Sequence, residues 1–310
     1  MAVFFNIDAL PAFRNAVITI GTFDGVHLGH RTILQKVVDR AQEVGGESVL
    51  ITFEPHPRKL LFPNQPLWFI TPLEQKLTLI TEAGIQNIVV VPFTREFSEL
   101  SADDYVEDFL VKTFRPHTII IGYDHRFGHD RTGSIELLRT FRQKYNYELT
   151  EIQAQLIDEA AVSSTKVRKA LKEGQVEEAT VMLGREHSLR GIVVRGAQLG
   201  RTIGYPTANI RLNEPEHIIP GIGVYAVRIL HNDTLYGGML SIGYNPTVTT
   251  DRSIKIEVNI FEFHEEIYDD IIEVFFVRRL RDEVKFHSLE ALKEQLHHDK
   301  EASLAALNGQ

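Results

Sequence analysis

The chain has 310 residues, of which 43% are hydrophobic and 24% charged. This length predicts two domains, and the composition excludes a disordered or collagen-like chain. Acidic residues outnumber basic ones by 42 to 33, in both halves of the chain, which argues against nucleic-acid binding. The absence of cysteine excludes disulfides, thiolate zinc sites and cysteine nucleophiles. Without a secretory signal or a membrane-spanning apolar run, we expect a soluble cytoplasmic protein with no membrane partner.

Short apolar strands alternate with helices in the first half of the chain. The predicted strands cover residues 16–21, 48–53, 87–92 and 118–122, and the predicted helices cover 31–44, 73–83, 101–114 and 135–144. Ser101 and Asp104 resemble a capping box at the start of the third helix. Buried-type strands separated by helices indicate a parallel sheet covered on both faces, with ligands at the carboxyl ends of its strands. We therefore predict a Rossmann-like α/β domain over residues 1–184.

The hydrophobic pattern changes after about Gly184. Apolar runs at 189–196, 223–230, 235–244, 254–263 and 271–280 follow each other without helical segments between them. Residues 231–233 and 264–270 are typical of hairpin loops. These features predict an antiparallel barrel of five or six strands within residues 185–310. An amphipathic helix is expected at its end, over residues 288–307.

The segment GTFDGVHLGH, residues 21–30, lies between the first strand and the first helix. Glycines at positions 21, 25 and 29 let the backbone approach a phosphate chain, and the helix presents free N–H groups to an anion. His27 and His30 are three residues apart, so both can face one ligand and donate hydrogen bonds to departing pyrophosphate. Two ordinary polar residues at a helix start are the alternative interpretation. A zinc site is disfavoured because no third ligand stands at a recognisable spacing.

This segment resembles the HxGH signature of the nucleotidyltransferase superfamily, whose members join ATP or CTP to a phosphorylated acceptor. SSTKVR, residues 163–168, is similar to the SSTxxR motif of the same superfamily. Its hydroxyls can cap a helix, and Arg168 can bind phosphate oxygens with two parallel hydrogen bonds. Alone, this second motif would indicate only a helix cap.

Three further motifs narrow the resemblance. TFEPHP at 52–57, GYDHRFG at 122–128 and GRTIGYPTANI at 200–210 together resemble the bacterial bifunctional riboflavin kinase/FMN adenylyltransferases, or FAD synthetases. The resemblance implies an adenylyltransferase domain followed by a six-stranded kinase barrel with a C-terminal helix. It implies ATP as co-substrate, Mg²⁺ as cofactor, riboflavin and FMN as substrates, and FMN and FAD as products. The oligomeric state expected is a monomer or a weak homo-oligomer.

For the adenylyltransferase domain, the resemblance implies three groups of site residues. The catalytic residues would be His27, His30 and Arg168. The nucleotide would be bound by Gly21, Phe23, Asp24, Gly25, Ser164 and Thr165. The flavin would be bound by Asp124, Arg126 and Phe127.

In the barrel, Thr207 and Asn209 alternate on an extended segment, so their side chains project to one side and their oxygens can complete a magnesium shell. Gly200 belongs to a glycine-containing loop suited to nucleotide phosphates. Through the resemblance, Glu257 is the expected general base for riboflavin, and Arg279 is expected to bind flavin. The alternatives are an ordinary proline-containing strand entry for residues 205–209 and a solvent-facing strand position for the acid.

The sequence departs from the family pattern at His125, Tyr205, Asn245 and Asn259. None of these positions carries the predicted chemistry, so we expect them to affect the packing around the flavin. Two other functions stay open. One is a nucleotidyltransferase for a different phosphorylated acceptor, and the other is a flavin-binding sensor without turnover. An aminoacyl-tRNA synthetase is disfavoured by the length and by the acidity of both halves.

Overall fold

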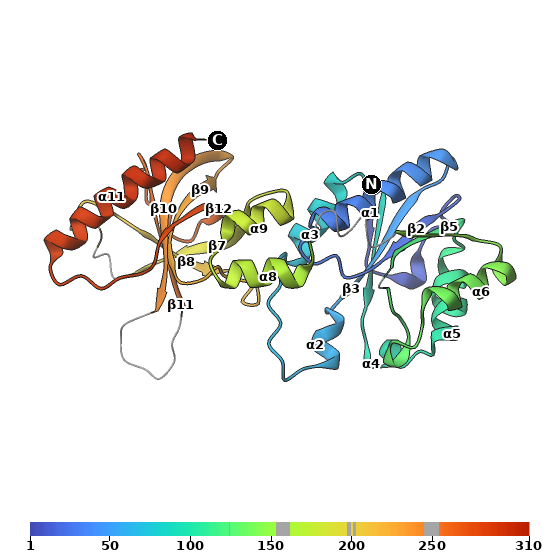
Figure 1. The fold of residues 1–310 in the computed structure, drawn as a ribbon. Coiled ribbons are helices and arrows are strands. Elements are labelled where there is room, and N and C mark those ends of the chain that lie inside the picture. Colours follow the sequence, from blue (N-terminus) through green and yellow to red (C-terminus); the bar gives the residue numbers. More distant parts are fainter. Residues whose placement is uncertain (124, 153–161, 197–199, 201–202, 245–253, 310) are drawn as a thin grey trace. The chain divides into compact units, whose positions relative to one another are not determined.

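The computed structural model describes residues 1–123, 125–152, 162–196, 200, 203–244 and 254–309. The chain divides into two compact units. The first unit comprises Met1–Leu67 and Thr71–Ser164, and the second comprises Trp68–Ile70 and Thr165–Gln310. Figure 1 shows the sheet of the first unit and the barrel of the second. By their contacts, residues 165–183 belong to the second unit, although they precede the boundary predicted at Gly184. That boundary stays a prediction.

The first unit contains a six-stranded parallel sheet in the order β1-β4-β3-β2-β5-β6. Its strands are β1 (Ala2–Phe4), β2 (Val17–Ile20), β3 (Ser48–Glu54), β4 (Asn87–Pro92), β5 (Thr118–Gly122) and β6 (Glu148–Ile152). The four predicted strands are confirmed, and they occupy the centre of the sheet. The two edge strands were not predicted, because β1 has three residues and β6 alternates exposed and half-buried positions.

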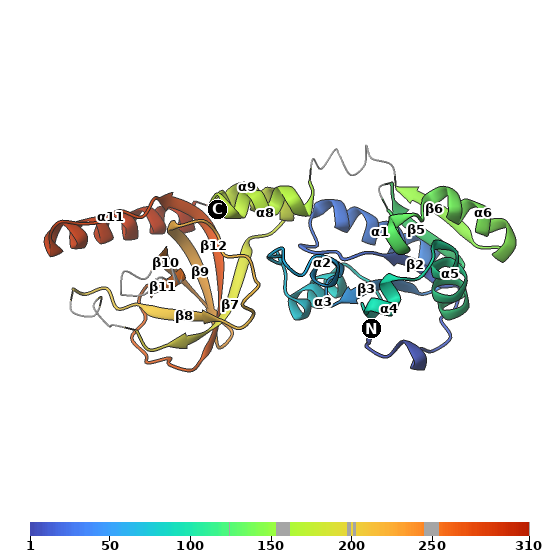
Figure 2. The same cartoon turned by 90° about the horizontal axis from the view of Figure 1, so that it is seen from below.

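Helices cover both faces of this sheet, as predicted (Figure 2). They are α1 (Leu28–Glu43), α2 (Pro57–Leu61), α3 (Leu73–Glu82), α4 (Arg95–Ser98), α5 (Ala102–Asp104) and α6 (Ile135–Tyr145), with short 3₁₀ turns η1 (Ile7–Ala9) and η3 (His129–Arg131) and the π-helix η2 (Tyr105–Lys112). Leu34 and Ile80 join the apolar cluster on one face, and Phe109 and Leu138 join the cluster on the other. The first unit therefore has the predicted three-layer α/β architecture.

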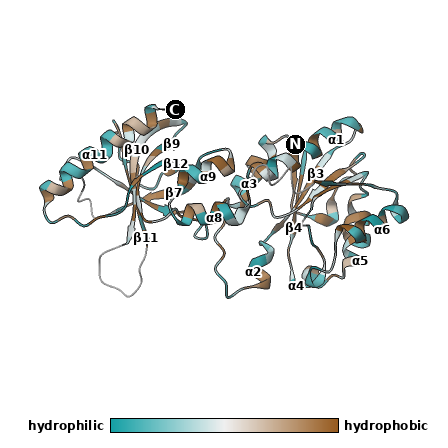
Figure 3. Cartoon of the chain, in the orientation of Figure 1, coloured by the Kyte–Doolittle hydropathy of each residue, from teal (hydrophilic) through white to brown (hydrophobic). Residues whose placement is uncertain are grey.

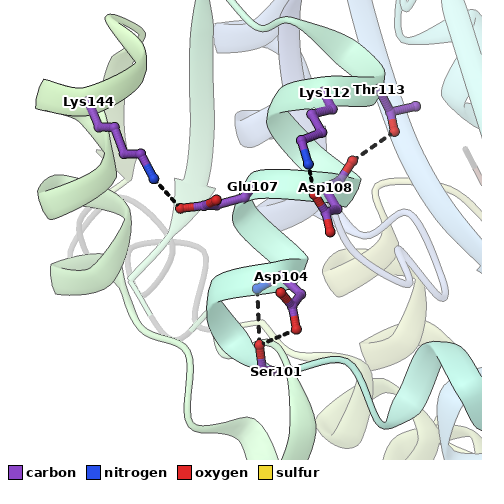
Figure 4. A network of polar contacts seen from close by, with 7 residues as sticks. All are labelled: Ser101, Asp104, Glu107, Asp108, Lys112, Thr113 and Lys144. Atoms are coloured by element: carbon purple, nitrogen blue, oxygen red, sulfur yellow. Dashed lines mark hydrogen bonds and ion pairs between the residues drawn. The ribbon is translucent and has the colours of Figure 1, made fainter.

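The helix predicted over residues 101–114 contains a π-helical stretch. Ser101 caps its start, and its Oγ accepts from the backbone N–H of Asp104 at 3.1 Å. Lys144 of α6 pairs with Glu107 across the surface at 2.5 Å (Figure 4). Residues Tyr105 and Phe109 of the same helix are buried in the core. The prediction that Ser101 caps this helix is confirmed. The ion pair of Lys144 and Glu107 lies on the outer side of the helix, whereas Tyr105 and Phe109 pack in the core.

The second unit is a closed six-stranded barrel in the order β10-β11-β8-β7-β12-β9, and every neighbouring pair is antiparallel. The strands are β7 (His187–Val194), β8 (Ala208–Leu212), β9 (Gly223–His231), β10 (Thr234–Tyr244), β11 (Ile254–Ile260) and β12 (Ile271–Arg281). Helices α8 (Ser164–Lys172) and α9 (Val176–Leu183) precede the barrel, and α11 (Leu289–Asn308) follows it. The predicted barrel and its C-terminal helix are confirmed.

One of the two predicted hairpin loops is confirmed and the other is wrong. Asn232 and Asp233 have φ values of 45° and 60° and join β9 to β10 as a tight hairpin. Residues 264–270 join β11 to β12, but β11 pairs with β10 and β8, whereas β12 pairs with β7 and β9. The connection therefore leads to a different part of the barrel, because polar loop residues mark a chain reversal without specifying which strands pair.

The C-terminal helix α11 begins at Ser288, whose Oγ accepts from the N–H of Ala291 at 3.1 Å. Arg281 binds the buried carboxylate of Asp299 with two hydrogen bonds of 2.8 and 2.6 Å, which ties the end of β12 to this helix. Hydrophilic and hydrophobic residues both occur along α11 (Figure 3), and its buried residues are Asp299, Ser303 and Ala306. Among the residues described, no helix is both long and apolar enough to cross a membrane.

Candidate active sites

The loop between β2 and α1 has an unusual backbone that suits a phosphate-binding turn. Phe23 and Val26 adopt φ values of 49° and 40°, and Gly25 has a φ of 92°. A Cβ atom at Gly21 would lie 3.1 Å from the ring of Phe23, so a side chain at this position would crowd the turn. Left-handed conformations at non-glycine residues persist only where surrounding contacts impose them. These contacts come from the buried residues described next.

The buried side chain of Asp24 stabilises the loop through a hydrogen bond. Its side chain is 3% exposed, and its Oδ1 accepts from the backbone N–H of Thr71 at 3.1 Å. The hydroxyl of Thr71 in turn accepts from the N–H of Gly25 at 2.9 Å. The hydroxyl of Ser164 donates to the main-chain carbonyl of Asp24 at 2.8 Å. Two motifs that are 140 residues apart therefore meet in the first unit.

The two motif histidines lie side by side at the start of α1. His27 is the N-cap residue, and its Nδ1 accepts from the N–H of His30 at 3.3 Å. The imidazole rings are stacked, with centroids 3.6 Å apart and planes 16° apart. Phe23 packs edge-on against His30 at 5.1 Å. Because Nδ1 of His27 is an acceptor, the neutral ring carries its proton on Nε2.

Arg168 and Thr165 belong to α8 and hence to the second unit, whereas both histidines belong to the first. The Nε of Arg168 donates to the carbonyl of Trp68 at 2.9 Å. Thr165 is exposed. Each side chain is thus placed within its own unit, and the prediction that Arg168 acts with the histidines stays a prediction.

The predicted flavin residues of the first unit have different environments. Asp124 lies outside the described residues, and Arg126 is exposed. Phe127 is 5% exposed, and its ring stacks on Tyr105 with centroids 4.9 Å apart and planes 24° apart. Burial raises the pKa of Tyr105. Tyr105 belongs to no recognisable motif, although its spacing from Phe109 in a helix indicates an inward position.

A second residue that the sequence analysis missed is Lys76 of α3. Its side chain is only 6% exposed, and its ammonium group contacts Thr22 in the GTFDG turn and Thr52 at the TFEPHP motif. Burial lowers the pKa of Lys76, while the charges of Glu54 and Asp24 act in the opposite direction. A lysine on an amphipathic helix gives no sequence signal of burial, because most such lysines face water.

The predicted kinase residues come together on two neighbouring barrel strands. Glu257 of β11 stands opposite Asn209 of β8 in the strand register. The hydroxyl of Thr207, just before β8, lies 3.5 Å from Oε1 of Glu257. Lys255 pairs with the same carboxylate oxygen at 2.9 Å. The arrangement collects a carboxylate, a hydroxyl and an amide on one patch of the barrel, with Lys255 as a member that the sequence analysis missed.

Two glycines make room for this patch. A Cβ atom at Gly196 would lie 2.0 Å from Nδ2 of Asn209, which leaves no space for a side chain there. A Cβ atom at Gly200 would lie 2.1 Å from the carbonyl oxygen of Tyr205 and 3.6 Å from the hydroxyl of Thr207. Gly200 is therefore next to Thr207, and its role in nucleotide binding stays a prediction.

The four residues that depart from the family pattern lie in different surroundings. Nδ2 of Asn259 donates to the carbonyl of Pro206 at 2.6 Å, which fixes the backbone next to Thr207. Tyr205 is partly buried beside this proline. Asn245 lies outside the described residues. The ring centroids of His125 and Phe127 are 5.8 Å apart, so His125 packs within the predicted flavin segment.

Arg279, predicted to bind flavin, packs near the turn between α8 and α9. Its Nη2 donates to the carbonyl of Ile222 at 2.8 Å and pairs with Asp282 at 2.7 Å. A Cβ atom at Gly174 would lie 2.7 Å from its Nε. These contacts hold the guanidinium within the second unit, and its flavin-binding role stays a prediction.

The hydroxyl of Thr207 and the amide oxygen of Asn209 are neutral oxygen donors of the kind that Mg²⁺ accepts. Gly196 leaves room for the amide of Asn209 beside the strand that carries Glu257. Within the described ranges, no group of three His, Cys, Asp or Glu side chains is placed to hold a metal ion. A magnesium ion here would thus depend on neutral oxygens together with nucleotide phosphates, as the sequence analysis expects.

Comparisons with known proteins agree with the two-unit architecture. A family model described as FAD synthetase matches residues 10–166, and a riboflavin kinase model matches residues 183–307. A bifunctional riboflavin kinase/FMN adenylyltransferase from Listeria monocytogenes is 38% identical over 94% of this chain and 92% of the relative. The enzyme of the same name from Escherichia coli K12 is 35% identical over 95% and 93%.

A solved structure also matches nearly the whole chain. The crystal structure of a macrolide-efflux protein from Streptococcus pneumoniae has a TM-score of 0.88 and 30% identity, covering 99% of this chain and 98% of that one. With two family models in tandem and full-length relatives, this chain belongs to the bifunctional riboflavin kinase/FMN adenylyltransferase family, which forms FMN and then FAD with ATP.

Proposed function

We propose that Glu257 is the general base of the riboflavin kinase reaction. It would take the proton from the ribityl 5′-hydroxyl, and that oxygen would attack the γ-phosphorus of ATP as the bond to ADP breaks. The observation that supports this role is the position of Glu257 opposite Asn209 and 3.5 Å from the hydroxyl of Thr207. Positioning and charge stabilisation supply most of the catalysis in such phosphoryl transfers.

We propose that Thr207 and Asn209 hold Mg²⁺ in the kinase site. When bound, the ion would supply positive charge that neutralises the nucleotide phosphates. Gly200 beside Thr207 would let the loop approach those phosphates without a side chain intervening. The all-oxygen donor set supports a hard cation over zinc.

We propose that the loop at residues 21–30 binds the ATP used for adenylylation. A phosphate oxygen of FMN would attack the α-phosphorus, and the bond to pyrophosphate would break. His27 and His30 would donate hydrogen bonds to the oxygens that gain charge, and their stacked rings at the start of α1 support this role. Arg168 would add a bidentate contact to the phosphates.

The remaining assignments are proposals of the same kind. The nucleotide site would be shaped or contacted by Gly21, Phe23, Asp24, Gly25, Ser164 and Thr165. Asp24 and Ser164 would act indirectly, through hydrogen bonds that hold the loop in place. Asp124, Arg126, Phe127 and Arg279 would contact flavin. We also propose the domain boundary at Gly184, a cytoplasmic location, and a monomer or weak homo-oligomer.

A product time course tests the proposal. Purified protein is incubated with riboflavin and Mg·ATP, and riboflavin, FMN and FAD are separated by chromatography. We expect FMN to appear first and FAD to follow, with EDTA stopping the first step. Binding of riboflavin without turnover would instead support a flavin sensor. Turnover of a different phosphorylated acceptor in place of FMN would support the other nucleotidyltransferase.

A further inference from the structure

Lys76 joins the ends of two neighbouring parallel strands in the first unit. Its Nζ donates to the carbonyl of Thr22 at 3.2 Å and to the hydroxyl of Thr52 at 3.1 Å. Thr22 follows β2, and Thr52 lies on β3, which pairs directly with β2. One ammonium group therefore connects two sequence motifs at the carboxyl edge of the sheet, where ligands of parallel sheets bind.

The burial of this charge is costly for the fold. Lys76 is 6% exposed, and desolvation lowers its pKa, with Glu54 and Asp24 partly compensating. A buried ammonium is tolerated only when hydrogen bonds and opposite charges offset its loss of water. A methionine would fill a similar volume without this cost. A lysine at such a position is therefore explained best by what its charge and donors do for the loop above it.

The loop that Lys76 contacts needs support. Phe23 and Val26 have left-handed backbone conformations, with φ values of 49° and 40°, and each carries a Cβ. The carbonyl of Thr22 directly precedes Phe23 and receives the Lys76 hydrogen bond. Without that bond, the backbone at residues 22–25 loses a contact that holds it in an unfavourable conformation.

We propose that Lys76 is a positioning residue of the adenylyltransferase. It holds the turn at residues 22–25 in the shape that receives the phosphates of ATP, and its charge favours that anion. This inference rests on the proposed assignment of the ATP site to residues 21–30. It concerns FMN adenylylation alone, because riboflavin phosphorylation belongs to the other unit.

The test compares Lys76→Met with the matched control Lys36→Met, which removes an exposed charge from α1 of the same unit. In Lys76→Met, we expect the KM for ATP in FMN adenylylation to rise about 10- to 100-fold, as for a lost charged hydrogen bond. The kcat should change much less. Lys76→Arg should restore most of the loss, since it keeps the charge and the donors. Lys36→Met should leave both constants within about twofold of the wild type.

Thermal unfolding reports whether the first unit of each variant is folded, and riboflavin phosphorylation by the second unit checks that the preparation is active. If Lys76→Met lowers the melting temperature but leaves the KM for ATP unchanged, Lys76 supports only the fold and the proposal is wrong. If Lys76→Met does not fold, Thr52→Val replaces it, because it keeps the lysine and removes the Thr52 hydroxyl, which accepts from Lys76 at 3.1 Å and donates to the carbonyl of Thr22 at 3.4 Å. We expect a rise of about three- to tenfold in KM for Thr52→Val, and an unchanged KM would contradict the proposal.

A separate result identifies failure of the underlying site assignment. If His27→Ala/His30→Ala retains normal FMN adenylylation, the ATP site is not at residues 21–30. In that case a KM effect of Lys76→Met would need another explanation, and the role proposed here would be rejected together with the site. If the histidine variant is impaired and Lys76→Met is normal, only the role of Lys76 is rejected.

Discussion

The two units build their sites in different ways. In the first unit, the proposed ATP site is a loop whose backbone is held by buried partners such as Asp24 and Thr71. In the second unit, the proposed kinase site consists of side chains on adjacent strands, and the register of β8 and β11 places Asn209 opposite Glu257. A loop site depends on many contacts beneath it, whereas a strand site depends on the few side chains that face the ligand. Substitutions should therefore separate the two reactions.

The largest effect is expected at the strand site. Glu257→Ala should lower riboflavin phosphorylation by about 10³-fold, because general-base catalysis is lost. The conversion of supplied FMN to FAD should stay normal, since its site belongs to the other unit. Chromatographic assays of both reactions measure this difference. Glu265→Ala, an exposed position on the connection between β11 and β12, serves as the control. Retention of kinase activity in Glu257→Ala would remove this carboxylate from the mechanism.

The opposite separation is expected at the loop site. His27→Ala/His30→Ala should lower FMN adenylylation by about 10²- to 10³-fold through lost charge stabilisation. Riboflavin phosphorylation should be unchanged and is measured with the same preparation. An equal loss of both activities in a folded protein would mean that the two reactions share a site, which would break the comparison made above.

A smaller difference concerns acid stability and is specific to the second unit. Burial lowers the pKa of His217 to about 4, and its Nε2 donates to the carbonyl of Ile70. The unfolded chain binds this proton below about pH 6.5, whereas the folded chain binds it only near pH 4, so stability falls as the pH drops through this window. The loss is about 3 kcal/mol for this shift.

The fluorescence of Trp68, the single tryptophan of the chain and a residue of the second unit, measures this loss during urea unfolding. His217→Gln should make the midpoint less dependent on pH between 4 and 6.5, while the exposed control His264→Gln should behave like the wild type. An unchanged pH dependence in His217→Gln would show that other groups cause the acid sensitivity. His187, whose pKa burial lowers well below the ordinary value, is the next residue to test.

The smallest predicted effect concerns a departure from the family pattern. Asn259→Ala removes the hydrogen bond to the carbonyl of Pro206. We expect about a fivefold loss in kcat/KM for riboflavin phosphorylation, corresponding to about 1 kcal/mol for one hydrogen bond. Asn213→Ala, at an exposed position after β8, should have no effect. A normal kinase in Asn259→Ala would mean that Thr207 keeps its position without this contact.

The sequence was sufficient to predict the central strands and the overall division into a sheet and a barrel. Buried strands such as residues 118–122 contain an uninterrupted apolar run, here three isoleucines, so their pattern is unambiguous. The edge strand β6 was missed because its residues alternate between exposed and half-buried. Strand β8 was recognised only as part of a motif, since Pro206 and a short length obscure the pattern.

The site could be predicted where a motif is continuous in the sequence, as at His27 and His30. It could not be predicted where a residue acts from another element. Lys76 and Tyr105 lie on helices whose sequences show only ordinary amphipathic spacing, and their contacts depend on tertiary packing. The ion pair of Lys255 with Glu257 could not be predicted either, because it depends on how the two side chains are oriented on the strand. The structural role of Asp24 could not be predicted because its hydrogen-bond partner, Thr71, is distant in the sequence.

The most direct test of the account is a mixing experiment with two defective variants. Glu257→Ala alone should form neither FMN nor FAD from riboflavin and Mg·ATP, and His27→Ala/His30→Ala alone should accumulate FMN. Because each variant keeps the site that the other lacks, an equimolar mixture should produce FAD. If the mixture forms no FAD although each variant is folded and retains its own partial reaction, FMN cannot serve as a free intermediate between two independent sites. Loss of both reactions in either single variant would contradict the separation of the sites itself.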